Sequence, residues 1–284
     1  MTTDPYRLIR PEARTTSVVF SSPHSGRDYP LAFLRRSMLD ELSVRSSEDA
    51  FVDILFSEAP MLGAPLLAAR APRAFVDLNR SADELDPALI EGVKKACHNP
   101  RVSSGLGVIP RVVANGRVIQ RGKITLEEAR ARLTDVWHPY HAALQTLLDE
   151  SHAAFGEAIL IDCHSMPHEA VGAARGGPRP DVVLGDRFGA AAQSEVVDRI
   201  EAAFAAAGLR VARNAPFAGA YITQHYGRPS RNQHVVQVEI NRGLYMDEAR
   251  VRPSPDFESF RRVITSVVSE IAAIGSSEMP LAAQ

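Results

Sequence analysis

The sequence predicts an α/β fold: one mixed, mostly parallel β-sheet flanked by helices. Short apolar runs rich in Val and Ile end in polar residues and alternate with longer helical patterns, which is typical of this class. No repeat, low-complexity tract or shift in composition marks a linker within the 284 residues. We therefore expect a single domain over residues 1–284, with residues 1–14 and 276–284 peripheral or frayed.

Short apolar runs of this kind suit strands that are buried on both faces. The expected strands are residues 17–20, 75–78, 158–161, 182–184 and 235–240. Four segments have helical patterns: residues 50–58, 125–155, 190–207 and 257–274. The second should begin at Thr125, with Glu128 three residues on, and should kink or divide at Pro139. Gly208 is suited to end the third. Residues 112–119 predict a hairpin turning at Asn115 and Gly116.

Composition excludes several classes of protein. With 32 basic and 34 acidic residues the net charge is −2, so we expect no nucleic-acid surface. Two cysteines cannot form a disulfide framework. No apolar run reaches the ~18 residues that a membrane span needs, and the first residues do not resemble a signal peptide. We expect a soluble, cytoplasmic protein with no membrane partner, and the sequence leaves its oligomeric state open.

Polar side chains follow several expected strands, at the sheet edge where α/β proteins place their function. His24 and His164 each follow a strand, although either one alone could be an ordinary turn or core histidine. Together with a carboxylate they match the two-histidine, one-carboxylate pattern of catalytic zinc. Asp49 is the first choice for that carboxylate and Glu48 the alternative, although Asp49 could simply stabilise the start of a helix.

Other residues at these strand ends are candidates for supporting roles. Asp162 lies two residues before His164, so it can orient that imidazole if the strand continues. Glu239 lies inside an apolar strand, where it either faces solvent or acts as a general base. Asn79 and Arg80 suit an anion clamp, although Arg80 can equally pair with a surface acid. The segment 216–229 offers further candidate substrate contacts: Gly219, Tyr221, Thr223 and His225. Residues 170–180 form either a solvated loop or a flap over the site.

The sequence resembles the N-formylglutamate amidohydrolase (N-formylglutamate deformylase) family of histidine degradation. The matching segments are SSPHSG at 21–26, SEDAFVDILF at 47–56, RAFVDLNR at 73–80, WHPYH at 137–141, LIDCHS at 160–165, ITQHYGRP at 222–229 and HVVQVEINRGLYMDE at 234–248. The resemblance implies a fold related to the zinc carboxypeptidases (phosphorylase/hydrolase-like).

The resemblance also implies a chemistry. One Zn²⁺ per chain, or another divalent ion, would be held by His24, Asp49 and His164. Glu239 would serve as general base and acid, and Arg80 with Asn79 would hold a substrate carboxylate. The expected reaction is hydrolysis of the N-formyl or N-acyl amide of an acidic amino acid such as N-formylglutamate. The alternatives are a related acyl-amino-acid amidase or peptidase, and a non-catalytic binding protein on the same fold.

Overall fold

The structure, a computed structural model, describes residues 4–94, 99–170 and 179–276. At its centre is a seven-stranded sheet with the order β1-β3-β2-β4-β7-β5-β6. Neighbouring strands are parallel except for β1 with β3 and β5 with β7. The mixed, mostly parallel sheet is therefore confirmed. Its strands are β1 (Tyr6–Ile9), β2 (Val18–Ser22), β3 (Leu66–Ala69), β4 (Ala158–Met166), β5 (Val182–Gly185), β6 (Val211–Arg213) and β7 (Gln233–Asn241).

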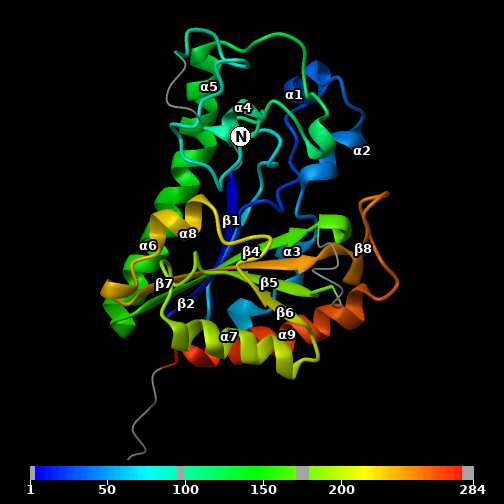
Figure 1. Cartoon of the computed structure of the whole chain (residues 1–284). Helices are drawn as coiled ribbons and strands as arrows, with labels where there is room; N and C mark the ends of the chain where they lie inside the picture. Colours follow the sequence, from blue (N-terminus) through cyan, green and yellow to red (C-terminus); the bar gives the residue numbers. More distant parts are fainter. Residues whose placement is uncertain (1–3, 95–98, 171–178, 277–284) are drawn as a thin grey trace, which may run out of the picture.

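Helices cover both faces of the sheet. The α-helices are α1 (Leu31–Arg36), α2 (Glu41–Val44), α3 (Val52–Leu55), α4 (Pro100–Ser103), α5 (Leu126–Arg132), α6 (His138–Phe155), α7 (Ser194–Ala206), α8 (Tyr221–Tyr226) and α9 (Phe257–Ile274). The short strands β8 (Met246–Asp247) and β9 (Arg252–Pro253) form a separate ribbon. Helices α3, α7 and α9 pack on one face, and α6 and α8 on the other (Figure 1). No helix in the described ranges is long and apolar enough to cross a membrane.

The two central strands separate apolar and polar side chains by alternation. In β7 the side chains of Val236, Val238 and Ile240 enter the core on the α9 face. Because successive side chains of a strand point to opposite faces, Glu239 faces the α6 side. Its neighbour across the parallel ladder is His164 in β4. One face of the sheet thus carries a run of polar side chains at its carboxyl edge.

Two expected strand boundaries need correction. Residues 75–78 form no strand, and the strand that pairs with β1 and β2 is β3, which lies earlier in the chain. The Asp77 side chain accepts a hydrogen bond from the backbone N–H of Asn79, a local bond that competes with sheet pairing. The alanine-rich β3 has weak strand propensity, so the pattern missed it. The strand expected to end at residue 161 continues to Met166.

The helix predictions hold in part. Within residues 50–58 only α3 forms, because Phe51 adopts a left-handed backbone conformation with φ of 67°. The long helix does begin after Thr125, whose side chain accepts from the N–H of Glu128. It then passes through one π-helical segment, η4 (Leu133–Trp137), before α6. The predicted interruption near Pro139 therefore takes the form of a π-segment. The third helix begins at Ser194, later than expected, and α9 matches its prediction.

Three other expectations concern loops and termini. At residues 112–119 the backbone turns with positive φ at Asn115 and Gly116. Val112 and Val118 form an isolated antiparallel bridge, and the N–H of Val113 donates to the carbonyl of Arg117, but the pairing does not extend into two strands. The N-terminal segment, expected to be peripheral, contributes β1 to the edge of the sheet, and β6 was not predicted. The segment 170–180, expected to be a solvated loop or a flap, and the expected frayed end at 276–284 lie mostly outside the described residues.

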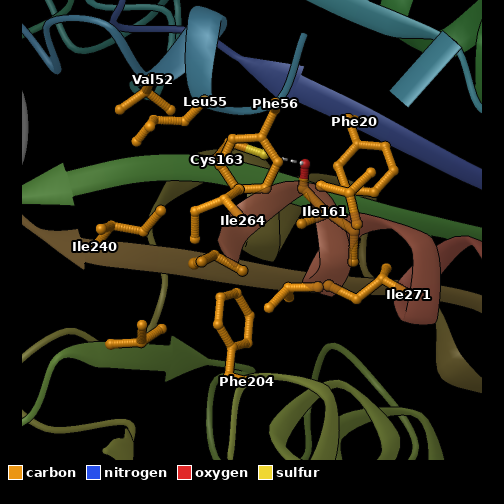
Figure 2. Close-up of a cluster of buried hydrophobic side chains, with 14 of the residues drawn as sticks. Phe20, Val52, Leu55, Phe56, Ile161, Cys163, Phe204, Ile240, Ile264 and Ile271 are labelled. Atoms are coloured by element: carbon orange, nitrogen blue, oxygen red, sulfur yellow. Dashed lines mark hydrogen bonds between the residues drawn. The ribbon is translucent and has the colours of Figure 1, made fainter. Parts of the chain in front are cut away.

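Phe56 fixes the short helix α3 to the core. Its side chain is fully buried, and its ring centroid lies 5.7 Å from that of Phe20 in β2. Figure 2 shows Phe56 among apolar side chains that include Ile161 of β4 and Ile264 of α9. Helix α3 begins three residues after Asp49, so this packing also restrains the segment that carries the Asp49 carboxylate.

Replacing Phe56 with alanine should leave a large cavity between the sheet and α9. We expect Phe56→Ala to lower the free energy of unfolding by about 3–5 kcal/mol, measured by urea denaturation. The matched control is Phe188→Ala, since Phe188 is 80% exposed and should change the free energy of unfolding by less than about 0.5 kcal/mol. Equal effects of the two substitutions would contradict this description of the core.

Candidate active site

A cavity of about 500 Å³ opens at the carboxyl ends of β2, β4 and β7. Loops before α3, after β3 and before α8 complete its wall. Seven of the residues predicted to form the site line it: His24, Asp49, Asn79, Arg80, His164, Gly219 and Glu239. The residues predicted from the ends of the strands are therefore brought together in one cavity.

Three side chains, all buried, converge in this cavity. Oδ2 of Asp49 lies 2.9 Å from Nδ1 of His164 and 3.4 Å from Nδ1 of His24. The ligand atoms that the three residues offer lie within 4.8 Å of one another. Nδ1 of His24 has no hydrogen-bond partner among the described residues, an unusual state for a buried nitrogen. Two imidazole nitrogens and one carboxylate oxygen form a donor set that suits a divalent cation.

Both imidazoles are anchored from behind by carboxylates. Nε2 of His24 lies 2.7 Å from Oδ1 of Asp77, and Nε2 of His164 lies 3.0 Å from Oδ2 of Asp162. A carboxylate at Nε2 holds a proton on that nitrogen, so Nδ1 is the nitrogen that can bind a cation once it carries no proton of its own. Asp162 thus lies where the i, i+2 spacing placed it.

The position of Asp49 distinguishes it from Glu48. Its backbone N–H donates to the carbonyl of His24, and Arg242 donates to its Oδ1 at 2.9 Å. Burial alone would raise the pKa of Asp49, but the adjacent imidazoles of His164 and His24 hold it well below its usual range. Glu48 instead accepts from Tyr29 and Arg45, and it does not line the cavity.

Glu239 lies beside this group. Its Oε1 accepts a hydrogen bond of 2.8 Å from Gln237, and the side chain is almost wholly buried. Burial raises the pKa of Glu239 to about 7; the positive charge of His164 opposes the rise and the negative charge of Asp49 adds to it. A carboxyl group with such a pKa can both accept and release a proton near neutral pH.

Asn79 and Arg80 differ in what their side chains offer. Oδ1 of Asn79 accepts from the N–H of Ile222, and its Nδ2 lies 3.1 Å from Nε2 of His164, so this amide is engaged within the protein. Arg80 is buried, and within the described part of the chain it donates only to the carbonyls of Leu106 and Asn79. Among the described residues it forms no ion pair, so its positively charged guanidinium faces the cavity without an acidic partner.

Three predicted substrate contacts do not line the cavity: Tyr221, Thr223 and His225, all on α8. The rings of Tyr221 and His225 stack on each other, with centroids 5.0 Å apart. Thr223 is buried beneath Gly219, where a Cβ on the glycine would come within 2.8 Å of the threonine hydroxyl. The geometry therefore gives these three side chains packing contacts and leaves Gly219 at the cavity wall.

The sequence patterns missed several residues that shape the site. Asp77 falls inside an expected strand, although a carboxylate within an apolar run is itself a signal. Arg242 and Gln237 orient Asp49 and Glu239. Arg73, which also lines the cavity, donates to Oδ2 of Asp77. Gln237 and Arg73 are close in sequence to the groups that they contact. Asp77 and Arg242 are far in sequence from His24 and Asp49, so only the fold identifies these two pairs.

Fold and site together define an α/β protein with a buried His–Asp–His group at the carboxyl edge of a mixed sheet. The family model for N-formylglutamate amidohydrolase matches residues 16–246. The N-formylglutamate deformylase of Pseudomonas aeruginosa is 33% identical over 268 residues, which cover 91% of this chain and 93% of that protein. The deformylase of Pseudomonas putida is 32% identical over 238 residues, covering 81% and 82%.

A solved structure agrees with these relatives. The crystal structure of N-formylglutamate amidohydrolase from Ralstonia eutropha matches with a TM-score of 0.90 and 33% identity, covering 96% of this chain and 99% of that one. The crystal structure of a gene product from Agrobacterium tumefaciens shares the fold at a TM-score of 0.64 and 17% identity, covering 95% of this chain and 97% of that one. The chain belongs to the N-formylglutamate amidohydrolase family.

The neighbouring carboxylates Asp49 and Glu48 provide a matched test of whether the His–Asp–His group binds a cation. Asp49→Asn removes the charged oxygen that faces both imidazoles, so we expect stoichiometric Zn²⁺ binding to be lost in a competition titration against a chelating dye. Glu48→Gln changes a carboxylate that faces away from the cavity and should retain the metal. Retention of wild-type affinity in Asp49→Asn would remove this residue from the ligand set.

Proposed function

We propose that this chain is a metal-dependent amidohydrolase that removes the formyl group from N-formylglutamate or a closely similar N-acyl acidic amino acid. The main support is the placement of Glu239 beside the buried group of His24, Asp49 and His164. The names of the two Pseudomonas relatives and of the Ralstonia structure support the substrate. A role in histidine degradation and a cytoplasmic location stay predictions.

His24, Asp49 and His164 would hold one divalent cation, and the unpartnered Nδ1 of His24 favours this assignment. A bound Zn²⁺ would lower the pKa of a water molecule and polarise the substrate carbonyl. Asp77 and Asp162 keep the two imidazoles oriented, and Arg242 keeps Asp49 in place. These contacts reduce the reorganisation that binding and reaction would require.

Glu239 would move the proton. It accepts a proton from water as the water oxygen adds to the formyl carbon, and it returns the proton to the nitrogen as the C–N bond breaks. The products are formate and the free amino acid. Gln237 fixes one carboxylate oxygen of Glu239, so the side chain is held ready for both transfers.

Arg80 would recognise a carboxylate of the substrate. A buried guanidinium without an acidic partner carries a large desolvation cost, which an anionic ligand can offset. Arg101 also lines the cavity, and its positive charge acts with that of Arg73 to lower the pKa of Arg80, behind the larger effect of burial. The concentration of positive charge favours a substrate with more than one carboxylate.

Glu239→Gln keeps the shape of the side chain and removes its capacity to accept a proton. We expect kcat for N-formylglutamate to fall by about 10²–10⁴-fold while Zn²⁺ content is retained. Glu127→Gln serves as control, since Glu127 is exposed on α5 and should leave kcat unchanged. If kcat of Glu239→Gln stays near the wild-type value, Glu239 has a structural role only.

Arg80→Ala tests the carboxylate clamp. We expect KM for N-formylglutamate to rise by at least about tenfold, because a charge-assisted hydrogen bond to a carboxylate contributes roughly 1.5–3 kcal/mol. Arg117→Ala, at an exposed position, should leave KM unchanged. Amine release from a panel of N-formyl amino acids measures the effect. An unchanged KM would place substrate recognition elsewhere.

A further inference from the structure

Residues 77–80 carry three separate contributions to the site in four consecutive positions. Asp77 anchors His24, Asn79 contacts His164, and Arg80 faces the cavity. This segment belongs to no helix or strand, so no ladder of backbone hydrogen bonds fixes it. A displacement of the segment would disturb both imidazoles and the Arg80 guanidinium at once. Its position must therefore be held by other contacts.

Two side chains of the long helical region supply such contacts. Nε2 of His141, on α6, lies 3.0 Å from the carbonyl oxygen of Leu78. Nε1 of Trp137, at the end of the π-segment, donates to the carbonyl oxygen of Arg80 at 2.9 Å. Both side chains are buried. The two bonds fix the backbone on either side of Asn79.

The imidazole of His141 is set up to donate at this position. A carbonyl oxygen can only accept a hydrogen bond, so Nε2 carries the proton and Nδ1 is free to accept from the hydroxyl of Tyr226, 2.9 Å away. Burial lowers the pKa of His141 to about 3, so the ring stays neutral at physiological pH. The ring also packs against Trp137, with centroids 3.9 Å apart.

The π-segment Leu133–Trp137 places these residues. A π-helical turn contains one residue more than an α-helical turn. The side chains that follow it are therefore rotated about the helix axis relative to those before it. Such segments are frequent at functional sites. Here the interruption ends at Trp137, directly before α6 begins.

We infer that Trp137 and His141 are positioning residues that hold residues 77–80 in the geometry required for cation binding and substrate recognition. This inference rests on the proposed function. The two bonds have different consequences. The Leu78 carbonyl lies between Asp77 and Asn79, so His141 controls the orientation of the imidazoles. Trp137 holds the carbonyl of Arg80 and controls the carboxylate clamp.

The test compares conservative variants in the full chain, using Zn²⁺ affinity, steady-state kinetics with N-formylglutamate and thermal unfolding. We expect His141→Phe to weaken Zn²⁺ binding and to lower kcat, each by about tenfold. His141→Gln keeps an N–H near the position of Nε2 and should recover most of both. Trp137→Phe should raise KM by about fivefold, the effect of one lost hydrogen bond, with Zn²⁺ affinity unchanged.

His138→Phe is the matched control, because it makes the same exchange at an exposed position of the same helix and should alter none of these values. A wild-type chain that neither binds Zn²⁺ nor releases amine would refute the proposed function itself. With an active wild type, the positioning role is overturned if His141→Phe and Trp137→Phe keep wild-type Zn²⁺ affinity and kinetics per folded molecule. A lower unfolding temperature of these variants would not rescue the positioning role, since such a fall alone reports a structural role.

Discussion

The site depends on a single electrostatic arrangement, in which the Asp49 carboxylate faces two imidazole nitrogens inside the protein. Bringing an ionised group out of water is costly, so the arrangement persists only if every member is compensated. Arg242 compensates the far oxygen of Asp49, and carboxylates occupy the outer nitrogens of both histidines. Removing one member leaves its partners buried and unbalanced, so these residues form one unit.

The pairing of strands in the sheet determines which residues of the site lie side by side. Parallel pairing of β4 with β7 puts His164 directly beside Glu239, and the same pairing in β2 and β4 brings their carboxyl ends to one edge. Asp49 arrives from a loop, tied to the carbonyl of His24 by a backbone hydrogen bond. Some residues of the site lie on strands, which are rigid. The others lie on loops, which contacts from other side chains must hold in place. This division explains why irregular residues 77–80 require support from α6.

The sequence predicted the strand-borne part of the site well and the loop-borne part less completely. His24 and His164 follow apolar runs whose strand character is unambiguous, and the i, i+2 spacing identifies Asp162 without knowledge of the fold. Asp77 escaped because its apolar neighbours Phe75, Val76 and Leu78 have the composition of a strand. Those neighbours belong to an irregular segment and pack into the hydrophobic core, so their apolar character reflects burial and not membership of a strand. The choice between Asp49 and Glu48 also required the fold, since both precede the same helix.

The segment carrying Tyr221, Thr223 and His225 illustrates a different limit. Its density of functional side chains predicted a pocket wall, yet a helix presents only part of its circumference to any one neighbour. In α8 the buried side turns Ile222 and Tyr226 toward the core beneath α6, and Tyr226 there meets His141. The hydroxyl of Tyr226 is thus connected to residues 77–80 from outside the cavity, through His141 and the carbonyl of Leu78. Composition can indicate that a segment matters to a site, but only packing decides whether its residues touch the ligand or hold those that do.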